Sequence, residues 1–196
     1  MPRFDLLHEN ISKSLGLEID IETFAPFYDL FIEKKVGKKY LLTEEGTVSQ
    51  YLYFINQGAA YIYYLNAASE ITVMQFGLEG YWITDMYSFL TGKTGVYNIE
   101  TLEPCDLLCI DLVNYEKAMA KIPYIERLFR ILTQNAFIAQ QNRIAKTNSE
   151  SAEHRYLEFS KLYPHFIQRI PQYLIASYLG IKPQSLSRIR HQLSKK

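Results

Sequence analysis

The spacing of hydrophobic residues changes from helical to strand-like and back along the chain, and this separates three regions. In residues 20–35 apolar side chains recur at helical intervals, which predicts a short amphipathic helix carrying Phe24, Phe27, Leu30 and Phe31. From Lys39 to about Leu112 the chain is dense in Tyr, Ile, Val and Phe, and turn sequences such as Glu45-Gly46 and Gln57-Gly58 divide it into short runs. This region predicts antiparallel strands, with one short helix after Trp82, in a small β-barrel or jelly roll.

Helical spacing returns at Pro123, a residue tolerated in a first turn, and the capping residues of "TNSES" at 147–151 predict a break in the helix there. Two faces of this long helix are apolar. One carries Ile125, Leu128, Leu132 and Ala139, and the other carries Ile131, Ile138 and Ala145, with Phe137 nearby. Two apolar faces need two partners, so we expect one to pack on the barrel and one to pair with a second copy of the chain. The first face is the expected dimer face, and a helix buried within one subunit is the alternative.

The segment "IPQYLIASYLGIKPQSLSRIRHQL" at 170–193 has the spacing of two short helices joined by a tight turn. Pro171 can begin the first helix, and small Ala176 allows a second helix to approach closely. Gly180 supplies the left-handed conformation that ends a helix without strain. The second helix starts after Lys182 and directs inward the side chains of Leu186, Ile189 and Leu193. We therefore predict a helix-turn-helix.

The net charge of zero conceals an uneven distribution along the chain. Residues 1–150 contain 13 Lys and Arg against 19 Asp and Glu, whereas residues 151–196 contain 8 against 2. No acidic residue occurs from Gln168 to Lys196. A basic, acid-free segment is typical of one that binds a polyanion.

The polar face of the second helix carries groups that hydrogen-bond to base edges, so this segment predicts binding to double-stranded DNA. Arg188 can make a bidentate contact to guanine, and Gln184 can pair with adenine. The expected base-reading residues are Gln184, Ser185, Ser187, Arg188 and His191. The expected phosphate contacts are Gln172, Tyr173, Lys182, Arg190 and Lys195.

The order of these regions resembles the Crp/Fnr family of bacterial transcription regulators. The strand segment "EEGTVSQYLYFINQGAAYIYY" is similar to the family's sensor domain, and Gln184, Ser187 and Arg188 are similar to its reading motif. The resemblance implies a cytoplasmic homodimer that reads a palindromic operator and recruits or blocks RNA polymerase. It also implies an α+β fold: a jelly-roll sensor at 1–121, a dimerisation helix at 122–148, and a helix-turn-helix domain at 149–196 that lacks an obvious wing.

The chain departs from the family's cyclic-nucleotide site. Family members that bind cyclic AMP use a Gly-Glu pair and an arginine, whereas this chain has Thr84-Asp85 and no arginine between Arg3 and Arg127. A guanidinium fork for a phosphate is therefore absent from this region, and we expect regulation that does not depend on cyclic AMP. The residues expected to line any other ligand pocket are Tyr81, Trp82, Thr84, Asp85 and Tyr97, although core packing is the better interpretation of the aromatic ones.

The remaining features argue against other protein classes. No run of about 18 apolar residues and no signal peptide is present, which favours the cytoplasm. Cys105 and Cys109 are too few for a disulfide framework, and no histidine lies between His8 and His154, so neither a metal enzyme on a cupin-like barrel nor any cofactor is expected. The alternative function is a small-molecule-binding or interaction module on a cupin-like barrel without DNA binding.

Overall fold

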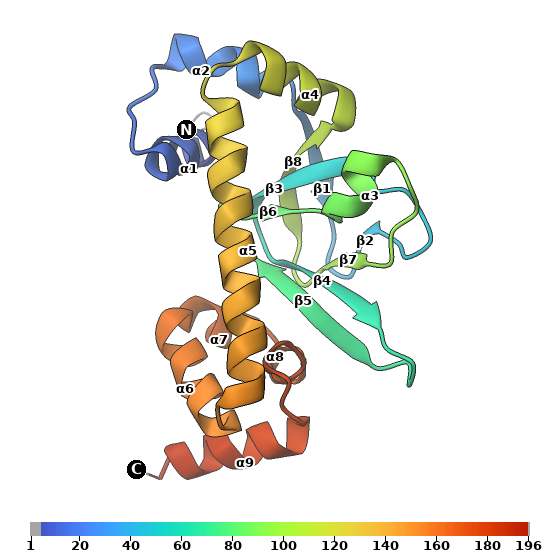
Figure 1. Cartoon of the computed structure of the whole chain (residues 1–196), viewed down its shortest axis with the longest axis vertical. Coiled ribbons are helices and arrows are strands. Elements are labelled where there is room, and N and C mark those ends of the chain that lie inside the picture. The colour runs from blue at the N-terminus through green and yellow to red at the C-terminus, as the bar shows by residue number, and fades with distance from the viewer. Residues whose placement is uncertain (1–4, 196) are drawn as a thin grey trace. The chain divides into compact units, whose positions relative to one another are not determined.

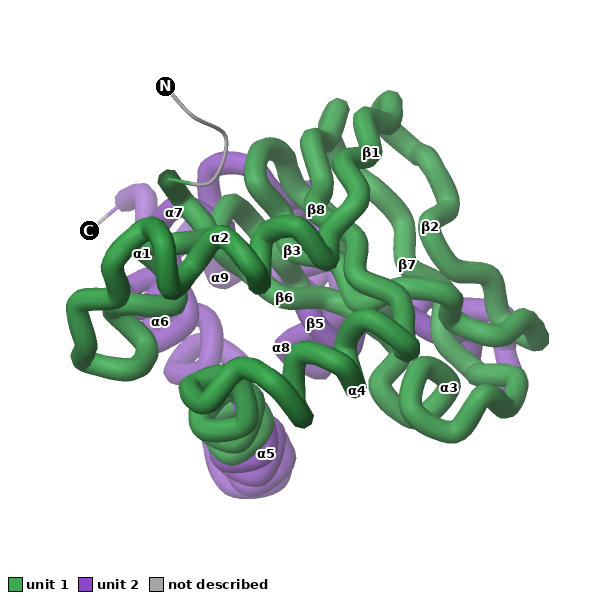
Figure 2. The backbone as a smooth tube through the Cα atoms, turned by 90° about the horizontal axis from the view of Figure 1, so that it is seen from above, with its two compact units in different colours: residues 1–62, 76–135 green, residues 63–75, 136–196 purple. Residues whose placement is uncertain are grey.

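The computed structural model describes residues 5–195, which form an α+β structure of helices and antiparallel strands (Figure 1). Lys196, the last residue of the basic segment, lies outside the described residues. The chain divides into two compact units, residues 1–62 with 76–135 and residues 63–75 with 136–196 (Figure 2). Because these units group residues by contact, the domain boundaries expected at 121 and 148 stay predictions.

Two four-stranded sheets make up the strand region, as its alternating pattern predicts. The first sheet has the order β1-β8-β3-β6 and the second the order β2-β7-β4-β5. Long β3 and β8 pair antiparallel at the centre of the first sheet, with Leu52 opposite Ile110 and Phe54 opposite Leu108. The strands are β1 (Ile32–Val36), β2 (Leu41–Thr43), β3 (Tyr51–Gln57), β4 (Ala60–Leu65), β5 (Ile71–Gly77), β6 (Trp82–Ile83), β7 (Asn98–Thr101) and β8 (Cys105–Asp111).

The predicted helix at 20–35 is wrong in its second half. Helix α2 covers Ile21–Tyr28, with Asp20 as its N-cap, and residues from Ile32 onward form strand β1 against β8. The Asp20 carboxylate accepts from the backbone N–H of Thr23 at 2.8 Å, and this bond holds the pKa of Asp20 below its usual value. Phe27 and Phe31 contact edge to face at 5.0 Å across the end of the helix. The apolar spacing therefore reports a shared core and not one continuous helix.

Three further helices complete the first unit: α1 (Asp5–Leu15), the short α3 (Met86–Thr91) and α4 (Leu112–Lys121). Helices α1 and α4 lie outside the elements predicted from the sequence. The core that they share with the first sheet includes a cluster of aromatic rings, in which Trp82 contacts Phe54 at 5.1 Å and Phe129 at 5.3 Å. Cys105 and Cys109 are buried free thiols in β8, consistent with a structural role.

Helix α5 (Ile125–Ser149) is the long helix that the sequence predicts, and it contributes residues to both units. Ile125 and Leu128 are fully buried in the core of the first unit. Their assignment to an exposed dimer face is therefore corrected. Of the two partners expected for the helix, the one inside the same subunit covers these two residues, in a core that includes residues of the first sheet. Leu132 is half-buried and Ala139 is exposed.

The helices of the second unit follow α5 closely. The predicted break is confirmed, because α5 ends at Ser149 and the Ser151 side chain caps the next helix by accepting from the N–H of His154 at 3.2 Å. These helices are α6 (Ala152–Leu162), α7 (Pro164–Arg169), α8 (Gln172–Leu179) and α9 (Pro183–Leu193). None of the helices within residues 5–195 is both long and apolar enough to cross a membrane.

The outer part of the β4–β5 hairpin belongs to the second unit, where helices contact the free edge of β5. The Ser177 hydroxyl of α8 donates to the carbonyl of Ile71 at 2.7 Å and accepts from the N–H of Val73 at 3.0 Å. The Arg143 guanidinium of α5 donates to the carbonyl of Val73 at 3.0 Å and lies 4.7 Å from the Tyr178 ring centre. Backbone groups that a neighbouring strand would bond are thus bonded by side chains.

Candidate nucleic-acid interface

The turn between α8 and α9 has the geometry that the sequence predicts. Gly180 adopts φ 63° and ψ 38°, in the left-handed region, and its N–H bonds to the last turn of α8. The N–H of Ile181 then donates to the carbonyl of Ala176 at 2.9 Å, and both side chains are buried. A glycine is required here because a side chain at this φ is strained. The turn therefore fixes the angle at which α9 leaves α8.

Helix α9 has one buried face and one exposed face. Leu186 and Ile189 are buried and Leu193 is half-buried, as predicted. Gln184, Ser187, Arg188 and His191 are exposed, whereas Ser185 is half-buried at the edge of the face. Successive helical residues turn by about 100°, so Gln184, Arg188 and His191 lie along one stripe opposite Leu186 and Ile189. Four of the five expected base-reading residues thus share an accessible surface.

The start of α9 has no side-chain cap. Lys182 is the N-cap residue, and its side chain accepts no hydrogen bond from the helix, as its chemistry requires. The N-cap side chain therefore accepts from none of the first backbone N–H groups of the helix, and Lys182 itself is exposed. Both features favour an anion at this end of the helix.

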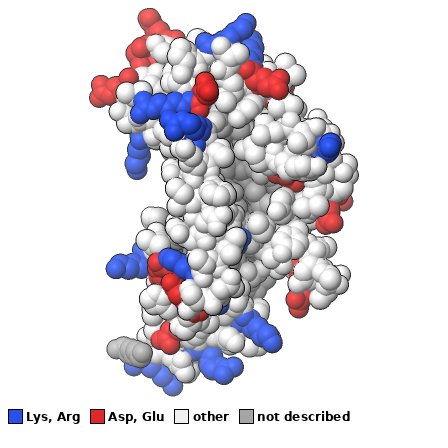
Figure 3. All heavy atoms as spheres, in the orientation of Figure 1, with Lys and Arg blue, Asp and Glu red and all other residues white. Residues whose placement is uncertain are grey.

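The other expected phosphate contacts differ in exposure. Arg190, Lys195 and Tyr173 are exposed, whereas Gln172 is half-buried and its side-chain amide donates to the carbonyl of Ile167 at 3.4 Å. Gln172 would have to give up this bond to reach a phosphate. In Figure 3, Lys and Arg atoms are prominent at the end of the chain where Figure 1 shows α9.

The residues expected to line a ligand pocket have different surroundings in the structure. Trp82 packs in the aromatic cluster of the core, and Tyr81 is 38% exposed. Thr84 donates its hydroxyl to the carbonyl of Tyr51 at 2.9 Å. Asp85 is buried and caps α3, accepting from the N–H of Ser88 at 3.1 Å, and Tyr97 is half-buried beside the last sheet strands.

Hydrogen bonds within the first unit hold the loop around α3. The Ser88 hydroxyl donates to the carbonyl of Lys93 at 2.6 Å and accepts from the N–H of Ser49 at 2.8 Å. The N–H of Gly95 donates to the carbonyl of Thr47 at 3.0 Å, and a side chain at Gly95 would lie 2.0 Å from a carboxylate oxygen of Asp85. These three donors are therefore engaged within the protein, and a carboxylate fills the space beside Gly95.

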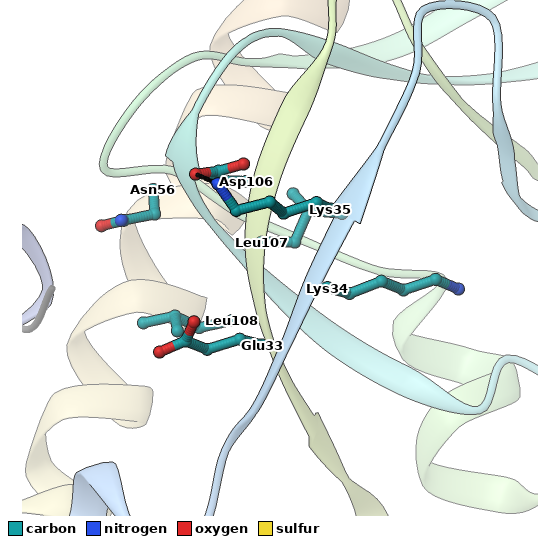
Figure 4. Close-up of a pocket in the computed structure, with 7 residues that line it drawn as sticks. All are labelled: Glu33, Lys34, Lys35, Asn56, Asp106, Leu107 and Leu108. Atoms are coloured by element: carbon teal, nitrogen blue, oxygen red, sulfur yellow. Dashed lines mark ion pairs between the residues drawn. The ribbon is translucent and has the colours of Figure 1, made fainter.

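A small depression lies elsewhere, on the first sheet (Figure 4). It is lined by Glu33, Lys34, Lys35, Asn56, Asp106, Leu107 and Leu108. Lys35 and Asp106 form an ion pair of 3.0 Å across the β1–β8 pairing, and Lys34 points away from them. None of the five expected pocket residues lines this depression.

Three residues that organise the second unit are missing from the predicted sites: Arg143, Arg155 and Ser177. Arg143 and Ser177 bind the β5 edge, and Arg155 binds the ends of two helices. The only sequence signal is their polar character on helices that are otherwise partly apolar, and polar residues on a helix are usually solvent-facing. Their partners are backbone carbonyls from distant segments, which a sequence pattern does not reveal.

Comparison of the structure with solved structures identifies the fold. FixK2 from Bradyrhizobium japonicum superposes with a TM-score of 0.72 at 18% identity, over 84% of this chain and 85% of that one. A protein from Eubacterium rectale described as a Crp/Fnr-family transcriptional regulator has a TM-score of 0.67 at 15% identity, over 99% and 88%. The chain has the Crp/Fnr fold. The catabolite activator protein of Thermus thermophilus shares it, with a TM-score of 0.61 at 15% identity over 93% and 87%.

The Crp/Fnr fold is recognised here by structure alone. No family model matches the sequence, and no curated protein matches it. The fold that the resemblance in the sequence implied is confirmed, both for the paired antiparallel sheets and for the C-terminal helix-turn-helix.

Proposed function

We propose that this protein is a DNA-binding transcription regulator whose helix α9 reads bases in the major groove. The observation that carries the proposal is the exposed, acid-free face of α9 on a helix-turn-helix, with Gln184, Arg188 and His191 along one stripe. These side chains offer the donors and acceptors that distinguish base pairs, and a Crp/Fnr fold places such a helix for this task. Such a regulator would act in the cytoplasm, where it recruits or blocks RNA polymerase.

The test is selection of binding sites from a pool of random double-stranded DNA, followed by affinity measurement over a series of salt concentrations. We expect the full chain to enrich a palindromic site, because two copies of α9 would read two half-sites. We also expect its affinity for that site to exceed its affinity for random DNA at every salt concentration. Failure to enrich any sequence would contradict the proposal.

We infer that the regulator is a homodimer formed through the exposed side of α5. Phe137, Ile138 and Ile144 are 63%, 55% and 57% exposed, which is unusual for large apolar side chains on one stretch of helix. This side includes Ile138 of the second apolar face noted in the sequence, whereas Ile125 and Leu128 of the first face are buried in the core. A second copy of α5 is the partner that matches a helix of this length in this fold.

Sedimentation tests the dimer. We expect the wild-type chain to sediment as a dimer at micromolar concentration and the Ile138→Lys, Ile144→Lys double variant to sediment as a monomer, because two charges would be buried in the interface. Asn135→Lys adds a charge at an exposed polar position of the same helix and serves as the matched control. A wild-type monomer, or a dimer that persists in the double variant, would refute this interface.

We further infer that the sensor unit does not use cyclic AMP. The supporting observation is the loop around α3. Asp85 accepts from the N–H of Ser88, the Ser88 hydroxyl donates to the carbonyl of Lys93, and no arginine is present in this loop. An anionic ligand placed there would meet a buried carboxylate instead of a cation.

A further inference from the structure

The Arg155 side chain, on α6, lies where two other helices end. Its Nε donates to the carbonyl of Leu179 at 3.1 Å, and one terminal nitrogen donates to the carbonyl of Gly180 at 3.4 Å. Its other terminal nitrogen donates to the carbonyls of Thr147 at 3.2 Å and Glu150 at 2.6 Å. One guanidinium therefore joins the end of α8 and the turn before α9 to the end of α5.

The chemistry of these acceptors explains why an arginine is suited to this place. The last carbonyls of a helix have no partner within the helix and carry partial negative charge. A guanidinium offers five N–H donors in a fixed plane and keeps its charge, so it can serve two such helix ends at once. A lysine offers a single ammonium point that cannot reach carbonyls on opposite sides of the plane.

The same junction is packed closely. A side chain added at Gly180 would lie 3.3 Å from the Thr147 methyl group, so the turn of the helix-turn-helix touches the last turn of α5. An ion pair between Lys146 and Glu158 joins α5 to α6 one turn away, and the bond to Glu158 raises the pKa of Lys146. Two half-buried side chains, Arg155 and Lys146, thus connect the helices at this junction.

We propose that Arg155 is a positioning residue that sets the orientation of the recognition helix α9 relative to the end of α5. The orientation itself is a property of one chain and does not depend on DNA. Its consequence rests on the proposed function: α5 carries the proposed dimer face and α9 the proposed reading face. The angle between them therefore sets the separation of the two half-sites that a dimer can contact.

The first experiment measures the orientation directly within one chain. Spin labels are attached at Gln141→Cys on α5 and Gln192→Cys on α9, both exposed positions, and the distribution of distances between them is recorded. The native thiols are buried, and burial raises the pKa of Cys109 to about 12, so labelling is directed to the new sites. Protein that carries the labels sparsely among unlabelled chains keeps the measurement within one subunit.

We expect one narrow distribution in the otherwise wild-type chain and a clearly broader one with Arg155→Lys. The matched control is Arg130→Lys, at a guanidinium that donates to the Gln134 side chain on the exposed surface of α5. If Arg155 only stabilised the fold, its substitution would lower the melting temperature without widening the distribution of label distances in the folded molecules. An unchanged width in Arg155→Lys would overturn the proposal. If that variant does not fold, Arg155→Gln, which keeps one planar amide, takes its place under the same criterion.

The second experiment measures the consequence on DNA. Affinity is compared between the palindrome selected by the wild-type protein and versions with one base pair added or removed at the centre. We expect the wild-type preference for the original spacing to fall several-fold in Arg155→Lys, while binding to an isolated half-site changes little. Equal losses of affinity at all centre spacings would show that Arg155 only stabilises the fold. A further outcome is that no palindrome is selected while the distribution of label distances still broadens in Arg155→Lys. That outcome would refute the proposed function and leave the positioning role intact.

Discussion

The N-terminal ends of helices α3 and α9 show opposite solutions to the same local problem. Both helices begin with backbone N–H groups that lack intrahelical acceptors. At α3 the Asp85 carboxylate accepts from the N–H of Ser88, and the surrounding loop is bonded to itself. At α9 the N-cap is Lys182, whose side chain accepts nothing, and Lys182, Pro183 and Gln184 are exposed. The start of α3 is closed, in that a protein side chain caps it, and the start of α9 is open, in that its N-cap side chain does not.

The two helix starts therefore differ in how they would interact with an added negative charge. The closed start already contains its anion, so a second anion would be repelled and would find few free donors. The open start has no side-chain cap and carries an exposed lysine, and both features favour an anion there. Under the proposed function, a phosphate of a nucleic-acid backbone would lie at α9 and no nucleotide phosphate at α3.

The largest effect is expected for Arg188→Ala on the exposed face of α9. If Arg188 forks onto guanine, the change costs roughly 1 to 3 kcal/mol for each half-site of the selected operator and relaxes the preference at one base position. Affinity for random DNA changes much less. Gel-shift titration on operator and random DNA measures both. Equal losses on the two DNAs would show that Arg188 is a solvated charge without a base-reading role.

A smaller effect is expected when the closed start is opened by Asp85→Ala. Loss of an N-cap acceptor typically costs about 1 kcal/mol, so the free energy of unfolding should fall by about that amount. Asp85→Asn keeps a side-chain oxygen that can accept from Ser88 and should lose less, which makes it the matched control. Chemical denaturation of all three proteins gives the comparison. A loss in Asp85→Asn as large as in Asp85→Ala would show that the cap is not what this carboxylate contributes.

Lys182→Ala should weaken binding modestly and to every DNA sequence. Removing one phosphate contact lowers the slope of log affinity against log salt concentration by about 0.9 for each copy of the side chain engaged. Base preference should stay as in the wild type. The measurement is a salt titration on operator and random DNA. A wild-type slope in this variant would place Lys182 outside the phosphate contacts.

The smallest effect is expected from cyclic nucleotides, which should produce no heat of binding and no change in melting temperature at physiological concentrations. The reason is the carboxylate and the occupied donors around α3. Titration calorimetry with cyclic AMP and cyclic GMP is the direct measurement. Micromolar affinity would mean that the loop rearranges to release its backbone N–H groups, and the contrast between the two helix starts would no longer hold.

Local features of the sequence predict the helix-turn-helix well. Its turn depends on one conformation at Gly180 and on apolar residues within one or two turns of it, so the pattern and the structure agree. The predicted helix at 20–35 fails because β1 exists through pairing with β8, where Ile32 lies opposite Cys109. A partner more than 70 residues away leaves no trace in a helical spacing of phenylalanines. Helix α1 did have a local signal, since Leu7, Ile11 and Leu15 repeat at intervals of four.

The dimer face shows a different limit of sequence reasoning. The sequence reveals that α5 has two apolar faces, but it does not say which of them the subunit itself covers. The structure buries Ile125 and Leu128 and exposes Ile138 and Ile144, and this exposure is the reason for proposing the second side as the dimer face. Arg155 is a further case, because its carbonyl partners come together only when α5, α6 and α8 are folded.

The side chains that cover the edge of β5 have a consequence for how the chain can be divided. An uncovered edge strand presents free backbone groups on which other chains can assemble into aggregates. A fragment that begins at residue 136 would lack residues 63–75, and Ser177 and Arg143 would lose the backbone partners that they have in the intact chain. A fragment that ends at residue 135 would leave the strand edge uncovered and prone to aggregation. The helix-turn-helix part and the hairpin are therefore best expressed, mutated and exchanged between proteins together.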